Sequence, residues 1–172
     1  RKSNATAYQV VAFYYARADR PPGRRGKLPG ISGGGLSASR LCGIFPAMAI
    51  TLPRLQKNVD RIRENIARQC EQTKRDPGDV KIIAVTKTVG LETIKRLLDV
   101  GITDFGESKV QQLTERAAEL DAYLQRRQAP LVEPVRWHMV GHLQRNKVRG
   151  ALAVAHCVHS VDSLRLAEEI DA

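Results

Sequence analysis

Apolar residues between positions 52 and 74 recur with the spacing of a helix that buries one face. The residues that repeat at intervals of four and three positions are Leu55, Val59, Ile62, Ile66 and Cys70. Charged residues fill most positions between them, so the pattern predicts an amphipathic helix from Leu52 to about Lys74. The Asp-Pro-Gly-Asp sequence at 76–79 predicts a turn that ends this helix.

After this turn the chain alternates between short apolar runs typical of strands and amphipathic segments typical of helices. The expected strands cover residues 80–88, 102–106, 135–141 and 156–160, and the expected helices cover residues 91–100, 107–124, 143–153 and 162–171. Repeated β/α units with short links require parallel strands and right-handed crossovers. The pattern therefore predicts an α/β fold, and periodicity alone leaves a doubly wound sheet and a barrel both open.

The first predicted strand is an apolar run that ends at a lysine, Lys87. In α/β barrels the carboxyl ends of the strands carry the reactive groups. In a regular strand Lys87 shares a face with Ile83 and Val85, and an amine among apolar groups is partly desolvated, which favours its neutral form. A neutral amine can condense with an aldehyde, so Lys87 is a candidate for covalent capture of a carbonyl cofactor. The alternative is that Lys87 extends into water, as most lysines do.

The ends of two further predicted strands also carry polar residues. A Phe-Gly-Glu-Ser sequence closes the second strand, and there Glu107 or Ser108 could either face a ligand or start and cap the next helix. A longer polar segment links the third strand to its helix, and there His138 or Asn146 could orient a cofactor. These positions would lie at the same edge of a parallel sheet as Lys87.

The histidines do not predict a metal site by their spacing. His138 and His142 lie on either side of a strand-to-loop turn, and His156 and His159 fall on opposite faces of a strand. No metal is therefore expected. Glycine-rich phosphate loops of the nucleotide-binding kinds are also absent from the sequence.

The formal net charge of +10 is concentrated at the start of the chain. Residues 1–50 hold eight Lys/Arg residues and one acidic residue, so the rest of the chain is nearly neutral and no nucleic acid is expected to bind the folded part. The Gly-, Pro- and Arg-rich composition of residues 1–47 predicts disorder. This segment is a basic tail, a targeting peptide, or upstream sequence ahead of a start at Met48, and the last fits best because a helix begins just after Met48.

The three cysteines, Cys42, Cys70 and Cys157, are odd in number and far apart in the sequence. This spacing indicates neither a disulfide framework nor a zinc ribbon, and it fits a reducing, cytoplasmic setting. No apolar stretch approaches the ~20 residues needed to cross a bilayer, so no membrane partner is expected.

Three motifs, taken together, resemble the pyridoxal phosphate homeostasis protein family, which consists of single-domain relatives of the alanine racemase barrel. The motifs are Ala84-Val85-Thr86-Lys87-Thr88, Phe105-Gly106-Glu107, and Trp137-His138-Met139-Val140-Gly141 followed by Leu143-Gln144-x-Asn146-Lys147. Each motif is weak alone, but their combination in this order is specific. The resemblance covers about Met48 to Ala172.

The resemblance implies that residues 48–172 form the N-terminal part of a TIM-type (β/α) barrel that binds pyridoxal 5′-phosphate (PLP). It implies a partial barrel of about four β/α units, preceded by the amphipathic helix. PLP would be held as a reversible aldimine on Lys87, with His138 and Ser108 as further pocket residues. The implied role is intracellular PLP homeostasis by a carrier or regulator without an established reaction, which passes PLP to PLP-dependent apoenzymes.

The chain departs from the family pattern at two motif positions and in its length. Ser108 and Lys109 stand where the family has asparagine and tyrosine, and His142 replaces a proline. The family's phosphate-gripping loops would lie beyond Ala172, so the sequence is interpreted as a truncated product. Half a barrel has an open strand edge, and it is therefore expected to self-associate, whereas full-length relatives are expected to be monomeric.

Two other functions stay open at this point. A racemase-like enzyme could use the same lysine-bound cofactor, but racemisation needs acid–base groups on both faces of the cofactor. A nucleic-acid-binding protein could act through the basic N-terminal tail.

Overall fold

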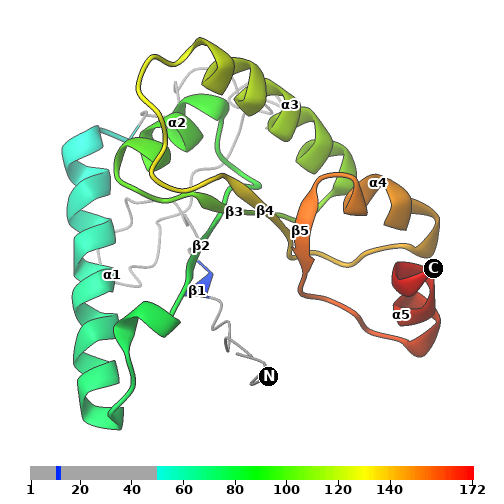
Figure 1. The fold of residues 1–172 in the computed structure, drawn as a ribbon, viewed down its shortest axis with the longest axis horizontal. Coiled ribbons are helices and arrows are strands. Elements are labelled where there is room, and N and C mark those ends of the chain that lie inside the picture. Colours follow the sequence, from blue (N-terminus) through cyan, green and yellow to red (C-terminus); the bar gives the residue numbers. More distant parts are fainter. Residues whose placement is uncertain (1–10, 13–49) are drawn as a thin grey trace, which may run out of the picture.

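The computed structural model describes residues 11–12 and 50–172 (Figure 1). The segment 1–47, expected to be disordered, lies outside the described residues except for Val11 and Ala12, so this expectation stays a prediction. The proposed start at Met48 lies outside them too.

A parallel sheet forms the centre of the described structure and confirms the prediction of a parallel α/β fold. Its strands are β1 (Val11–Ala12), β2 (Ile82–Val85), β3 (Asp104–Glu107), β4 (Arg136–Met139) and β5 (Ala155–Val158). Each strand pairs with the next one along the chain, so the order across the sheet is β1-β2-β3-β4-β5. The two residues of β1 pair with Ile82 and Ile83 and extend the sheet beyond β2.

In the part of the chain that the structure describes, five helices accompany the sheet. They are α1 (Leu52–Thr73), α2 (Leu91–Asp99), α3 (Val110–Arg126), α4 (Val148–Leu152) and α5 (Leu164–Asp171), with short 3-10 turns η1 (Pro77–Asp79) and η2 (Arg145–Lys147). The prediction started α3 and α4 too early. Helix α3 begins only after its N-cap residue Lys109, because Glu107 is still part of β3, and α4 is preceded by η2.

One face of the sheet packs against the helices. Ala84, Phe105 and Trp137 are cross-strand partners on this face, and the rings of Phe105 and Trp137 lie 5.5 Å apart. They share a core with buried residues of α1, α2 and α3, namely Leu55, Val59, Ile94, Leu97, Leu98, Leu113, Ala117 and Leu120. Met139, on the same face of β4, packs in a second cluster with Leu143, Val148, Ala151 and Leu166.

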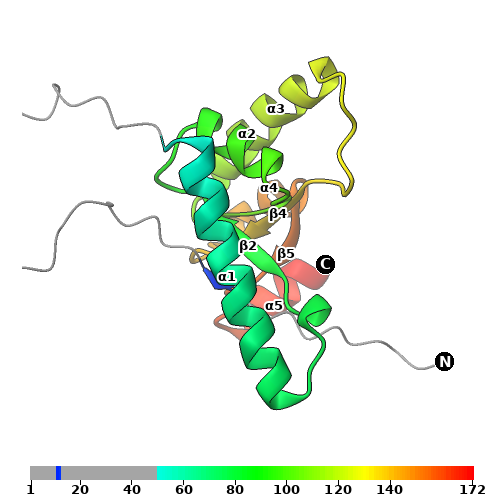
Figure 2. The ribbon, with the colours of Figure 1, turned by 90° about the vertical axis from the view of Figure 1, so that its left-hand side faces the viewer.

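The helices therefore lie outside a curved row of strands (Figure 1). Viewed from the side of α1, the long helix runs past β2 (Figure 2). We call the face of the sheet that points away from these helices the inner face. Val85, Gly106, His138 and Cys157 form one cross-strand row on it.

Candidate functional site

Lys87 lies immediately beyond the carboxyl end of β2. The strand ends at Val85, two residues before the lysine, whereas the sequence predicted a strand to residue 88. The N–H of Val89 donates to the carbonyl of Thr86 at 3.0 Å, so Lys87 sits in a tight turn. Strand alternation therefore does not decide the direction of the Lys87 side chain, which is half-buried.

The residue before the lysine is held firmly. Thr86 is 1 % exposed, its N–H donates to the carbonyl of Gly106 at 2.9 Å, and its hydroxyl donates to Oε1 of Glu107 at 2.6 Å. Its carbonyl accepts from Val89 and also from the guanidinium of Arg116. These bonds fix the backbone from which the Lys87 side chain starts.

A buried ion pair behind the strand ends supports Thr86. Glu107 is fully buried, and Arg116 on α3 donates to its Oε1 at 2.7 Å. Both side chains lie on the helix-covered side, so Glu107 does not face the inner side of the sheet. The alternative that Glu107 or Ser108 caps α3 is wrong, because Lys109 is the N-cap residue and no side chain caps this helix.

Sequence reasoning missed Arg116, although the sequence carries a signal for it. The apolar face of α3 contains Leu113, Ala117 and Leu120. Arg116 lies on the same face, three positions after Leu113 and four before Leu120. A lone charge on the buried face of a helix requires a partner. That partner is Glu107, nine positions earlier in the chain.

The loops that follow β3, β4 and β5 meet at Gly141. A Cβ atom placed on Gly141 would lie 2.6 Å from Cα of Ser108, so only glycine fits without movement of the backbone. The hydroxyl of Ser160, beyond β5, donates to the carbonyl of Gly141. Ser108 is thus half-buried in a loop packed at the same edge of the sheet as Lys87.

A row of ionisable side chains, connected by close polar contacts, lies on the inner face below this edge. Asp104 accepts from Arg136 at 3.0 Å and contacts Nε2 of His138 at 2.9 Å. Nδ1 of His138 lies 3.0 Å from Nε2 of His159. Both ring nitrogens of the buried His138 are therefore engaged by protein groups, one layer deeper than the loops that hold Lys87 and Ser108.

Burial, hydrogen bonds and neighbouring charges shift the pKa values of three groups on this face. Burial acts to raise the pKa of Asp104, but hydrogen bonds from His138 and Arg136 outweigh it and hold the pKa below its ordinary value. The pKa of His159 is lowered by burial and by the neighbouring His138. Burial raises the pKa of the Cys157 thiol. The carboxylate of Asp104 is thus ionised at neutral pH, and the imidazole of His159 carries a proton less readily than an ordinary histidine.

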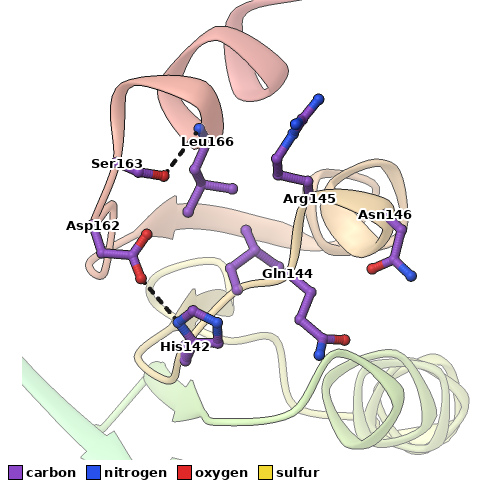
Figure 3. Close-up of a pocket in the computed structure, with 8 residues that line it drawn as sticks. His142, Gln144, Arg145, Asn146, Asp162, Ser163 and Leu166 are labelled. Carbon is purple, nitrogen blue, oxygen red and sulfur yellow. Dashed lines mark hydrogen bonds and ion pairs between the residues drawn. The ribbon is translucent and has the colours of Figure 1, made fainter.

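A separate cavity of about 470 Å³ lies between the segment after β4 and the start of α5 (Figure 3). Asn146, suggested by the sequence as a residue that orients a cofactor, lines this cavity. His142 closes one side through a 3.0 Å contact with Asp162, and the hydroxyl of Ser163 caps α5 by accepting from the N–H of Leu166 (Figure 3). Lys87 and His138 are not among its lining residues.

Within the described residues no helix is both long and apolar enough to span a membrane. Cys70 and Cys157 are free thiols.

Comparison with known proteins confirms the resemblance shown by the three motifs. The chain is 34 % identical over 110 residues to a protein named pyridoxal phosphate homeostasis protein from Mycobacterium tuberculosis, covering 64 % of this chain and 43 % of that protein. A protein of the same name from Pseudomonas aeruginosa is 31 % identical over 116 residues, covering 67 % and 46 %. The chain thus matches somewhat less than half the length of these relatives. No family model matches it.

Two solved structures also match part of this chain. A crystal structure of an unknown protein from Bifidobacterium adolescentis has a TM-score of 0.61 at 32 % identity, covering 69 % of this chain and 49 % of that one. The PLP-bound structure of PipY from Synechococcus elongatus has a TM-score of 0.48 at 33 % identity, covering 62 % and 46 %.

Proposed function

We propose that this protein binds PLP and takes part in PLP homeostasis, with Lys87 as the covalent anchor. The observation that carries the proposal is the sequence match to proteins named for this function, together with a lysine at the carboxyl end of a parallel strand. The loops that follow β3, β4 and β5 at that edge pack tightly around Gly141, and in this proposal they would form one wall of the pocket beside the lysine.

We further propose that the sheet is a segment of a (β/α) barrel. Strands that follow one another in sequence also follow one another in space, with the helix-packed residues on one shared face. This is the arrangement of a (β/α) barrel, whereas a doubly wound sheet reverses its strand order and carries helices on both faces. In a barrel the inner face would point to the interior. Lys87 would then lie at the rim formed by the carboxyl ends of the strands, where barrels carry their functional groups.

Capture of PLP would be a condensation between the amine of Lys87 and the aldehyde group of the cofactor. Lys87 Nζ would attack the aldehyde carbon of PLP, a C=N bond would form, and the aldehyde oxygen would leave as water. Thr86, held by hydrogen bonds on its N–H, hydroxyl and carbonyl groups, would limit the region that the lysine side chain can sample. Ser108 would contribute to the wall of the pocket, and His138 would form part of its floor, since both of its nitrogens are already engaged.

The proposed role is storage and release rather than catalysis. The names of the relatives describe homeostasis, and condensation of a lysine with an aldehyde is reversible, so one lysine can hold PLP and release it to PLP-dependent apoenzymes. Such a transfer needs no second acid or base on the opposite face of the cofactor.

Lys87→Ala in the full chain is expected to abolish formation of the lysine–PLP absorbance band and of the borohydride-fixed adduct. The matched control is Lys81→Ala, because Lys81 is also half-buried and flanks the opposite end of the same strand. Peptide mapping after borohydride should locate the label on Lys87 in the parent chain and in the control. Equal labelling of the parent chain and the Lys87→Ala variant would overturn the proposal.

A further inference from the structure

Three side chains with metal-binding chemistry meet on the inner face of β4 and β5. They are His138, Cys157 and His159, and their nearest ligand atoms all lie within 4.8 Å of one another. We propose that these three residues bind a zinc ion. Two imidazoles and one thiolate are ligands that zinc prefers, and three protein ligands leave a fourth position for water or another ligand.

An irregularity in the sheet makes this grouping possible. Trp137 pairs with Ala155, but the next residue, His138, pairs with Cys157, so β5 has one extra residue at this point. The extra residue is His156, whose side chain is exposed. A bulge of this kind redirects side chains, and here it places the thiol rather than His156 opposite His138. Sequence spacing alone did not group these residues, because it compared only histidines close together in the chain.

The groups behind His138 have the arrangement found around zinc ligands. Asp104 contacts Nε2 of His138 at 2.9 Å and is itself bound by Arg136 at 3.0 Å. An ionised carboxylate at Nε2 holds the proton on that nitrogen, which leaves the lone pair of Nδ1 directed at His159 and the cluster. A carboxylate–histidine pair of this kind orients the ligand and raises its basicity.

Zinc binding requires only a small rearrangement. Nδ1 of His138 and Nε2 of His159 are 3.0 Å apart, a hydrogen-bond distance. Two nitrogens on one tetrahedral zinc ion lie about 3.3 Å apart. The proton of His159 would move from Nε2 to Nδ1, and both facing nitrogens would then offer lone pairs. The S–H bond of Cys157 would break, a Zn–S bond would form, and the proton would go to solvent.

The proposed zinc site shares only His138 with the proposed PLP pocket. It uses neither Lys87 nor Ser108, and its ligands come from β4 and the β5 end. A bound ion would tie these two neighbouring segments together, so zinc should raise the melting temperature of the chain.

The test is zinc titration of the full chain, reduced and free of PLP, by calorimetry with metal analysis of the dialysed protein. We expect one zinc ion per chain and a higher melting temperature. His159→Gln and Cys157→Ser should weaken binding at least about tenfold, since each removes a direct ligand. Cobalt should give a thiolate charge-transfer band that disappears in Cys157→Ser, a nearly isosteric change that tests the site even if bulkier changes disturb folding.

The chain supplies matched controls. His156→Gln removes the exposed histidine next to the site, and Cys70→Ser removes the other described free thiol, in α1. Both should bind zinc like the parent chain, and so should Lys87→Ala, which separates this proposal from the PLP function. Absence of zinc binding by the parent chain would overturn the proposal, as would binding that is unchanged in both His159→Gln and Cys157→Ser.

Discussion

Replacing Arg116 with methionine is expected to lower the free energy of unfolding by about 3–5 kcal/mol, the usual cost of breaking a buried ion pair from one side. Glu107 has a fully buried side chain, and the Arg116 side chain is only 16 % exposed. Methionine keeps much of the apolar stem but leaves the carboxylate without its guanidinium partner. Chemical denaturation monitored by circular dichroism would measure the change.

Arg145→Met is the control, because Arg145 pairs with Glu169 at 3.4 Å with both side chains well exposed. Its expected cost is only about 0–1 kcal/mol. Similar losses for the Arg116 and Arg145 variants would contradict the buried-pair argument. The double variant Glu107→Gln/Arg116→Met should cost less than the sum of the two single changes, since the second change removes a charge already left unpaired.

The same network links stability to the proposed function. Arg116 also donates to the carbonyl of Thr86, the residue before Lys87. Labelling of Lys87 by PLP and borohydride should therefore fall in Arg116→Met under conditions where the variant is still folded. Arg116→Lys should restore part of the labelling, because lysine keeps the charge but cannot reproduce the planar guanidinium contacts with both Thr86 and Glu107.

Local patterns predicted most of the architecture. The helix-like spacing of apolar residues located α1 and α2 closely, and the β-branched run at 80–85 located β2. The predicted ends of helices and strands were wrong where tertiary contacts determine them. Thr86 looks like a strand residue, but its carbonyl is used by Val89 and Arg116, and the chain turns there.

The residues of the candidate site also differ in whether the sequence alone could predict them. Lys87 could be found from the sequence because a lysine at the end of an apolar strand is a local signal. The grouping of His138 with Cys157 depends on strand register and on the bulge at His156, neither of which is encoded in short-range spacing. Sequence reasoning therefore located the candidate anchor at the end of the strand, whereas only the folded sheet revealed the possible metal ligands.

Gly141→Ala is expected to cost about 1–3 kcal/mol in the free energy of unfolding, the range for inserting a methyl group into well-packed structure. The new Cβ would lie 2.6 Å from Cα and 2.8 Å from the carbonyl carbon of Ser108, and backbone atoms cannot move aside as a flexible side chain can. The loop after β3 must shift, and Ser160 would have to follow or lose its bond to the Gly141 carbonyl.

Gly90→Ala is the matched control, since no atom lies within 4 Å of a Cβ placed there and the backbone φ of −84° suits any residue. We expect this control to retain stability within about 0.5 kcal/mol of the parent chain. Because the loops around Gly141 form the proposed wall beside Lys87, Gly141→Ala should also slow PLP labelling of the folded chain, whereas Gly90→Ala should not. Equal stability and equal labelling in the two variants would show that the Ser108 and Gly141 loops do not form a closely packed wall, and they would overturn this part of the proposed PLP pocket.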